Sequence, residues 1–168
     1  MAEAAEVRLN LGCGKKHFKG YINIDFPSKW CTVKPDLECD IRVLPYGNDS
    51  VDEIVAIHVF EHFFLWEAPS ILDEWARVLK PGGKLALELP CLNKVIGFLN
   101  QNPISVRHTL FALYGDPTYE APEMVHKWCY SREHLTAMLS HRFENIKEGR
   151  CQFHVPERDM RLVAFKKG

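Results

Sequence analysis

The chain has 168 residues, 46% of them hydrophobic, which is enough to form one domain with its own core. Its formal net charge is only −1, so no strong field draws it to nucleic acid, and a nucleic-acid partner is disfavoured. No basic leader and no long uncharged apolar stretch occur, so we expect a soluble, cytoplasmic protein without a membrane segment.

The chain begins with a strand, a glycine turn and a second strand. Residues 7–11 are typical of a short strand that enters the turn Gly12-Cys13-Gly14, and the apolar run 21–24 ends in Asp25. Glycine has no Cβ, so the backbone of such a turn turns sharply and approaches a ligand closely. An acid at the end of the next strand accepts hydrogen bonds from ribose hydroxyls. This stretch therefore predicts a nucleotide cradle, although Asp25 also fits an ordinary strand-end cap.

Two common classes of nucleotide-binding protein that contain such a cradle are disfavoured. A dinucleotide fold needs Gly-x-Gly-x-x-Gly, and its third glycine position is His17 here. The connection from Gly14 to Tyr21 is also too short for a full crossover helix. The chain has no Gly-x-x-x-x-Gly-Lys-Ser/Thr loop for nucleoside triphosphates either.

The later elements follow from hydrophobic periodicity and from turn residues. Strands are predicted at 36–41 (a short strand or turn), at 53–59 (buried on both faces), at 84–89, and as a terminal antiparallel hairpin at 145–153 and 160–166. Helices are predicted at 66–79 (with Pro69 in the first turn and Gly82-Gly83 as the stop), around 93–99 and 104–113, and at 131–139 (opened by Ser131).

This order predicts an α/β domain with a parallel sheet and helices on its faces, the doubly wound class. Such sheets bind ligands outside the carboxyl ends of their strands, near which Asp25, Asp40 and His58 are expected. Six cysteines have no Cys-x-x-Cys spacing, which disfavours a zinc ribbon or a redox pair and indicates free thiols: Cys13, Cys31, Cys39, Cys91, Cys129 and Cys151.

Five stretches, in order along the chain, resemble the class I S-adenosylmethionine-dependent methyltransferases, specifically a small subgroup of the type 11 kind: residues 9–14, 23–25, 57–62, 74–83 and 126–131. The resemblance implies a single Rossmann-like methyltransferase domain over residues 1–168. It also implies a seven-stranded sheet of order 3-2-1-4-5-7-6 with its last strand antiparallel. The chain departs from the family between Gly14 and Tyr21, where the segment is short for the family's first helix.

The resemblance also implies site residues. S-adenosylmethionine is the implied cofactor, and its contacts are Leu11, Gly12, Cys13 and Gly14 for the methionine portion, Asp25 for the ribose, Asp40 and Ile41 for the adenine, and His58 beside the transferable methyl group. The predicted catalytic residues are His58 and His126, although Glu61, His62 and His108 are further available bases and no sequence feature chooses among them. For Asp40 and His58, an ordinary structural role fits equally well.

The implied function is methyl transfer to an oxygen or nitrogen acceptor on a small molecule, sugar or protein. Residues 92–127 are expected to form a substrate-covering insert. The sequence leaves the acceptor and the oligomeric state open. Two alternatives stand beside this function: a non-catalytic S-adenosylmethionine-binding partner subunit, and a zinc hydrolase based on the His-x-x-Glu-His pattern of residues 58–62. That pattern needs a helix to gather both histidines and here follows a strand, so no metal site is expected.

Overall fold

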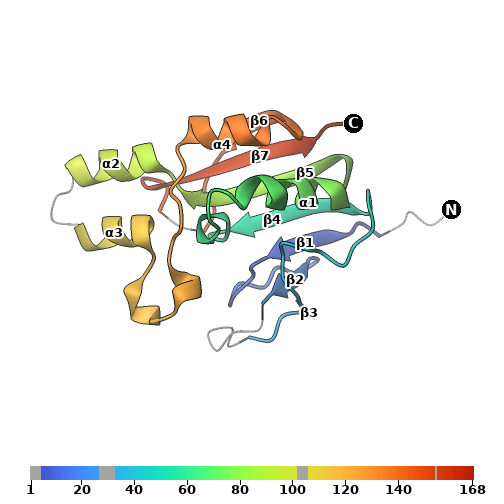
Figure 1. Cartoon of the computed structure of the whole chain (residues 1–168), viewed down its shortest axis with the longest axis horizontal. Helices are drawn as coiled ribbons and strands as arrows, with labels where there is room; N and C mark the ends of the chain where they lie inside the picture. The colour runs from blue at the N-terminus through green and yellow to red at the C-terminus, as the bar shows by residue number, and fades with distance from the viewer. Residues whose placement is uncertain (1–4, 27–32, 102–105, 154) are drawn as a thin grey trace.

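A seven-stranded sheet organises the chain in the computed structural model, which describes residues 5–26, 33–101, 106–153 and 155–168. The strand order is β3-β2-β1-β4-β5-β7-β6, and β7 runs antiparallel to both of its neighbours (Figure 1). This confirms the predicted order and the terminal hairpin. The strands are β1 (Arg8–Leu11), β2 (Ile22–Asp25), β3 (Leu37–Glu38), β4 (Val51–Ile57), β5 (Leu79–Pro90), β6 (Phe143–Gly149) and β7 (Asp159–Lys166).

Within the described residues, four α-helices and three short 3-10 turns connect the strands. They are η1 (Phe60–His62), α1 (Ala68–Val78), α2 (Leu92–Gln101), α3 (Val106–Tyr114), η3 (Pro117–Tyr119), η4 (Pro122–Met124) and α4 (Arg132–Leu139). Pro69 lies in the first turn of α1, and Ser131 caps α4 by accepting a hydrogen bond from the His134 N–H, as predicted. The predicted stop of α1 at Gly82-Gly83 is wrong, because Leu79 is already extended and pairs with Val51 in the sheet.

The main core lies between the sheet and two helices. Alternate side chains of the central strands point to this face, since successive residues of a strand face opposite sides. Trp75 of α1 is fully buried, and its indole N–H donates to the carbonyl of Ile41 at 2.9 Å. Buried residues that join the strands to α1 and α4 in one cluster include Leu9, Leu11, Ile54, Ala56, Leu85, Leu87, Ile71, Leu135 and Leu139.

Within the described residues, α1 and α4 cover the same face of the sheet, in an α/β fold with the predicted strand order. The chain moves from β4 to β5 and then to β6 in one direction across the sheet, so right-handed connections place α1 and α4 on the same side (Figure 1). The connection from β1 to β2 moves in the opposite direction and would place its helix on the other side. Residues 12–21, all of which the structure describes, contain no helix.

Two loops and a set of polar side chains lie on the face of the sheet opposite α1 and α4. Asn10 is buried and donates to the carbonyl of Lys16 and to the side chain of Asn23, which fastens the short first connection to the sheet. Glu88 accepts the N–H groups of Gln152 and Phe153, each at 2.9 Å. These bonds explain why β6 ends at Gly149 rather than at the predicted residue 153.

The segment between β5 and α4 lies beyond the carboxyl ends of β4 and β5 (Figure 1). It holds α2, α3, η3 and η4, and the start of the predicted helix at 104 falls outside the described residues. In the described part of the chain, no helix is both long and apolar enough to cross a bilayer.

Candidate functional site

The glycine turn after β1 has the backbone conformation that its sequence predicts. Gly12 and Gly14 have φ of +62° and +50°, values that residues with a side chain adopt rarely. A Cβ on Gly14 would meet no atom within 4 Å, so open space lies beside the turn. A Cβ on Gly12 would lie 2.3 Å from Cγ2 of Val59, so the loop after β4 packs directly against the turn. The turn is therefore a cradle beside the end of β4.

Asp25 closes this cradle from the end of β2. Its Oδ2 accepts the N–H of Gly14 at 2.6 Å, and its Oδ1 accepts the N–H of Phe26 at 2.7 Å. Each carboxylate oxygen has a second acceptor site, so both remain able to receive a ribose hydroxyl. The turn and the carboxylate thus fit the predicted cofactor.

The other predicted cofactor residues differ in burial and in their hydrogen-bond partners. Leu11 and Cys13 are buried, and Ile41 belongs to the core. Asp40 is held by Arg42, whose Nε and terminal nitrogen lie 3.0 and 2.7 Å from its Oδ2, and these hydrogen bonds lower the pKa of the Asp40 carboxyl. A side-chain contact to adenine therefore requires Asp40 to leave Arg42.

His58 follows β4 directly and has an uncommon backbone conformation, with φ of +54°. Its Nδ1 lies 3.0 Å from Oε1 of Glu61, and its Nε2 lies 3.4 Å from Oδ2 of Asp159. Burial alone would lower the pKa of His58, but the two carboxylates outweigh it and raise the pKa to about 10. His58 is therefore a cation at neutral pH, which is the wrong state for a general base.

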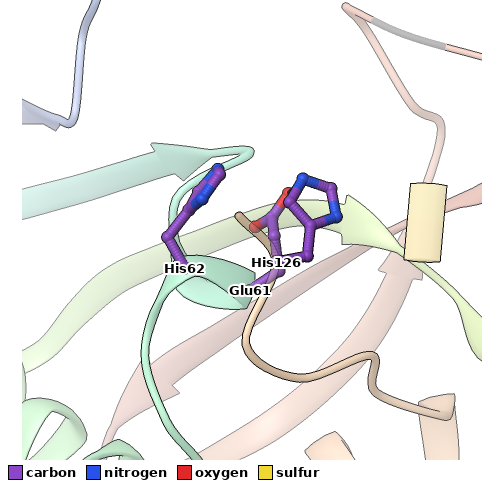
Figure 2. Close-up of side chains that lie close together, drawn as sticks. All are labelled: Glu61, His62 and His126. Atoms are coloured by element: carbon purple, nitrogen blue, oxygen red, sulfur yellow. Dashed lines mark ion pairs between the residues drawn. The ribbon is translucent and has the colours of Figure 1, made fainter. Parts of the chain in front are cut away.

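Two distant segments bring Glu61, His62 and His126 together, and we call these three residues the acid–histidine cluster. Glu61 and His62 belong to η1, whereas His126 comes from the strand-like segment before α4. The backbone carbonyl of Glu61 accepts the N–H of Lys127 at 2.7 Å, which fixes the second segment against the first. Figure 2 shows the three side chains gathered there, with the Glu61 carboxylate beside the His126 ring.

Backbone carbonyls set the orientation of both histidine rings. Nδ1 of His126 lies 3.0 Å from the carbonyl oxygen of Ala112, and Nδ1 of His62 lies 3.3 Å from that of Val125. A carbonyl oxygen only accepts, so the Nδ1–H of each ring donates to it, and Nε2 lies on the other side of the ring. Nε2 of His126 points to Glu61, 3.9 Å from its Oε1. Burial lowers the pKa of His62, which favours its neutral form.

Glu61 is the charged centre of the cluster, with only 1% of its surface exposed. Burial would raise the pKa of its carboxyl, but the positive charge of His58 outweighs burial and lowers it to about 2. Its Oε2 has no hydrogen-bond partner among the residues that the structure describes. A buried ionised oxygen without a partner is costly, so this atom faces a place where a cation or a donor belongs.

An apolar cavity of about 880 Å³ adjoins the cluster. It is formed by the second half of the insert and reaches Val125, whose carbonyl holds His62. Its lining residues include Val106, Leu110, Phe111, Tyr114, Pro117, Pro122 and Met124.

The sequence patterns did not identify the contact partners that set the charge and the orientation of the histidines in this site. Asp159 lies between the two predicted strands of the terminal hairpin, and nothing in the sequence pairs it with His58. The His-x-x-Glu-His pattern suggested His58 and His62 as joint ligands, but η1 is a single turn and His58 precedes it, so the two do not share a helical face. The side chain of His108 lies outside the described part of the structure, as does Cys31. None of the five described cysteines forms a disulfide within the described part of the chain.

Comparison with known proteins agrees with the fold. A profile of the methyltransferase domain family matches residues 9–87. A search of curated proteins gives no significant match.

Three solved structures illustrate the fold similarity. An S-adenosylmethionine-dependent methyltransferase from Methanosarcina mazei has a TM-score of 0.63 at 20% identity, with 99% of this chain and 94% of that chain covered. An S-adenosylmethionine-dependent methyltransferase from Thermotoga maritima, a possible histamine N-methyltransferase, has a TM-score of 0.66 at 15% identity, with 96% of this chain and 82% of that chain covered. A chain from the complex between the Haloferax volcanii Trm112 methyltransferase activator and the putative methyltransferase scores 0.60 at 16% identity, covering 99% and 84%.

Proposed function

We propose that this chain is an S-adenosylmethionine-dependent methyltransferase that transfers a methyl group to an oxygen or nitrogen acceptor, because the methyltransferase domain profile matches residues 9–87 and the strand order fits that fold. The domain match supports S-adenosylmethionine as the cofactor, which supplies an electrophilic methyl group when bound. The observation that carries the proposal is the open glycine turn at Gly14 closed by the Asp25 carboxylate. Action in the cytoplasm stays a prediction from the sequence.

The acceptor is proposed to lie between this cradle and the insert of residues 92–127. Val59 packs on Gly12, so the loop that carries the acid–histidine cluster adjoins the cofactor side of the sheet. The cavity beside the cluster is mostly apolar, which supports an acceptor with an apolar portion on a small molecule, sugar or protein side chain. Of the two histidines predicted as catalytic, His126 directs its Nε2 toward Glu61, whereas His58 is held between the carboxylates of Glu61 and Asp159.

Calorimetric titration of the full chain with S-adenosylmethionine and S-adenosylhomocysteine tests the cofactor. We expect binding of both and none of NAD, and Asp25→Ala should weaken binding by about 1.5–3 kcal/mol through the loss of charge-assisted hydrogen bonds. Asp73→Ala is the matched control, because Asp73 is exposed and pairs with Arg142. A folded protein that gives no heat with either adenosyl ligand would refute the proposed function.

Transfer of a labelled methyl group to pooled small molecules, sugars and proteins tests the reaction. His126→Ala should lower turnover far more than His141→Ala, because His141 is exposed and distant from the cluster in sequence. Equal turnover in both variants would remove His126 from the site.

A second candidate function is a partner subunit that binds the cofactor without transferring its methyl group. The absence of a helix in residues 12–21 supports it, since the family's first helix is missing from the cofactor side. The similarity to a chain from a complex with a methyltransferase activator makes such a partner worth testing. Tight cofactor binding without transfer to any acceptor class would favour this alternative.

A further inference from the structure

We propose that Glu61, His62 and His126 form a binding site for one divalent transition-metal ion. The site is distinct from the His-x-x-Glu-His pattern, because it uses His126 from another segment in place of His58. Its ligand set is one carboxylate oxygen and two imidazole nitrogens, which suits zinc, cobalt, iron or nickel ions. The site itself stands on geometry alone, and only its role in acceptor binding rests on the proposed function.

The three side chains are close enough to share an ion. One ligand atom from each lies within 4.8 Å of the other two. Around a zinc ion with bonds of about 2.0–2.2 Å, tetrahedral ligands lie roughly 3.4 Å apart. The rings must therefore close by roughly 1.4 Å at most, which small side-chain rotations provide. Three ligands leave at least one coordination position open.

The surroundings of the histidines match what a metal ligand requires. A ligating histidine commonly donates its other N–H to a backbone carbonyl, which fixes the ring and its tautomer. Ala112 and Val125 supply such carbonyls, so Nε2 of both rings is directed away from backbone partners.

The carboxylate of Glu61 is oriented in the same manner. His58 contacts its Oε1 at 3.0 Å, and Asp159 holds His58 from the other side. His58 is therefore a positioning residue for the ligand rather than a ligand itself. Oε2 lacks a partner in the described structure although it is buried. A purely structural ion pair with His58 leaves that oxygen unexplained, whereas a metal ion provides its missing partner.

The position of the site suggests what the ion does. It lies at the carboxyl end of β4, on the loop whose Val59 touches the cofactor turn, and it borders the apolar cavity through Val125. An open coordination position there would orient the oxygen or nitrogen of an acceptor whose apolar part fills the cavity.

Metal titration of the chelator-treated full chain tests the site. We expect one Zn²⁺ or one Co²⁺ per chain by calorimetry. The cobalt form should show visible absorption without the strong near-ultraviolet charge-transfer band that cysteine ligands give. His62→Ala and His126→Ala should each weaken binding by more than the about 10- to 100-fold that loss of an outer hydrogen bond costs. The exposed His141→Ala should change nothing.

Three outcomes would overturn the site: no stoichiometric ion, equal binding in all variants, or a cysteine-type cobalt spectrum. Far-ultraviolet circular dichroism of both variants checks that they fold, and His126→Gln repeats the test with a smaller change of volume. Cofactor titration separates this inference from the proposed function. Protein that binds S-adenosylmethionine but no metal refutes the site alone, whereas protein that binds metal but no adenosyl ligand refutes the function alone.

Discussion

The cofactor cradle and the acid–histidine cluster adjoin at the carboxyl edge of the sheet, but the chain builds them differently. The cradle is local: Gly12, Gly14 and Asp25 follow one another closely, and their fit depends on backbone conformation. The cluster is assembled across the chain, since 63 residues separate His62 from the Val125 carbonyl that orients it. The cradle should thus be sensitive to added side-chain volume, and the cluster to the loss of charge.

The largest effect is expected where the cluster loses its buried cation. His58→Asn keeps a residue that tolerates positive φ but leaves the carboxylates of Glu61 and Asp159 unpaired in the interior. Breaking a buried ion pair from one side costs about 3–5 kcal/mol. Urea unfolding monitored by circular dichroism measures this loss.

His141→Asn is the control for that measurement, because an exposed site changes stability by only about 0.5 kcal/mol or less. A loss near that of the control would mean that the ion pairs around His58 contribute little. Cofactor titration of His58→Asn also tests the predicted contact of His58 with the methyl end of the cofactor.

The next effect concerns Gly12, where the two regions touch. Gly12→Ala adds a methyl group that collides with Val59 at a backbone angle unfavourable to alanine. Positive φ and overpacking together should cost about 2–4 kcal/mol of unfolding free energy. The double variant Gly12→Ala/Val59→Ala removes the collision but not the strain. It should therefore recover about 1 kcal/mol or more relative to the sum of the single changes. Additive losses would show that the turn and the loop are independent.

The difference between local and assembled structure explains which predictions succeeded. The terminal hairpin and the Ser131 cap were predictable because each depends on short patterns of apolar, turn or capping residues, whereas the strand order came from the family resemblance. The short stretch between Gly14 and Tyr21 predicts a missing helix but does not say what covers the sheet there. The buried Asn10–Asn23 bond and the Glu88 loop contacts fill that face.

The candidate site also contains residues that the sequence identified and residues whose role depends on contacts between distant segments. The glycines and Asp25 were recognisable because spacing along one segment carries their geometry. Residues 57–62 indicated a chemical site, but the protonation state of His58 depends on Asp159, and the ring orientation of His126 depends on Ala112. Contacts between segments so far apart leave no pattern in a single sequence.

A smaller effect is expected from alanine at Gly14 or Gly20, and comparing the two distinguishes backbone strain from loss of cofactor binding. Gly14 and Gly20 both have positive φ, and a Cβ on either meets no atom within 4 Å. Alanine at each should cost about 1–2 kcal/mol of stability from the backbone angle alone. Only Gly14→Ala places its methyl group where the cofactor is proposed to bind, so it alone should weaken S-adenosylmethionine binding, by about tenfold (~1.4 kcal/mol) or more. Equal affinities in the two variants would place the cofactor away from the turn.

The smallest effect is expected at Asp40, the predicted adenine contact whose carboxylate Arg42 already holds. The pair is largely exposed, with 37% and 51% of the two side chains accessible, so Asp40→Asn should cost less than about 1 kcal/mol of stability. Cofactor affinity should change little, because the carboxylate reaches adenine only by giving up Arg42. Arg42→Ala frees Asp40 and supplies the complementary test. If Arg42→Ala strengthens cofactor binding and the double variant Arg42→Ala/Asp40→Asn loses that gain, the Asp40 side chain contacts adenine. If neither single variant alters cofactor affinity, Asp40 has only a structural role.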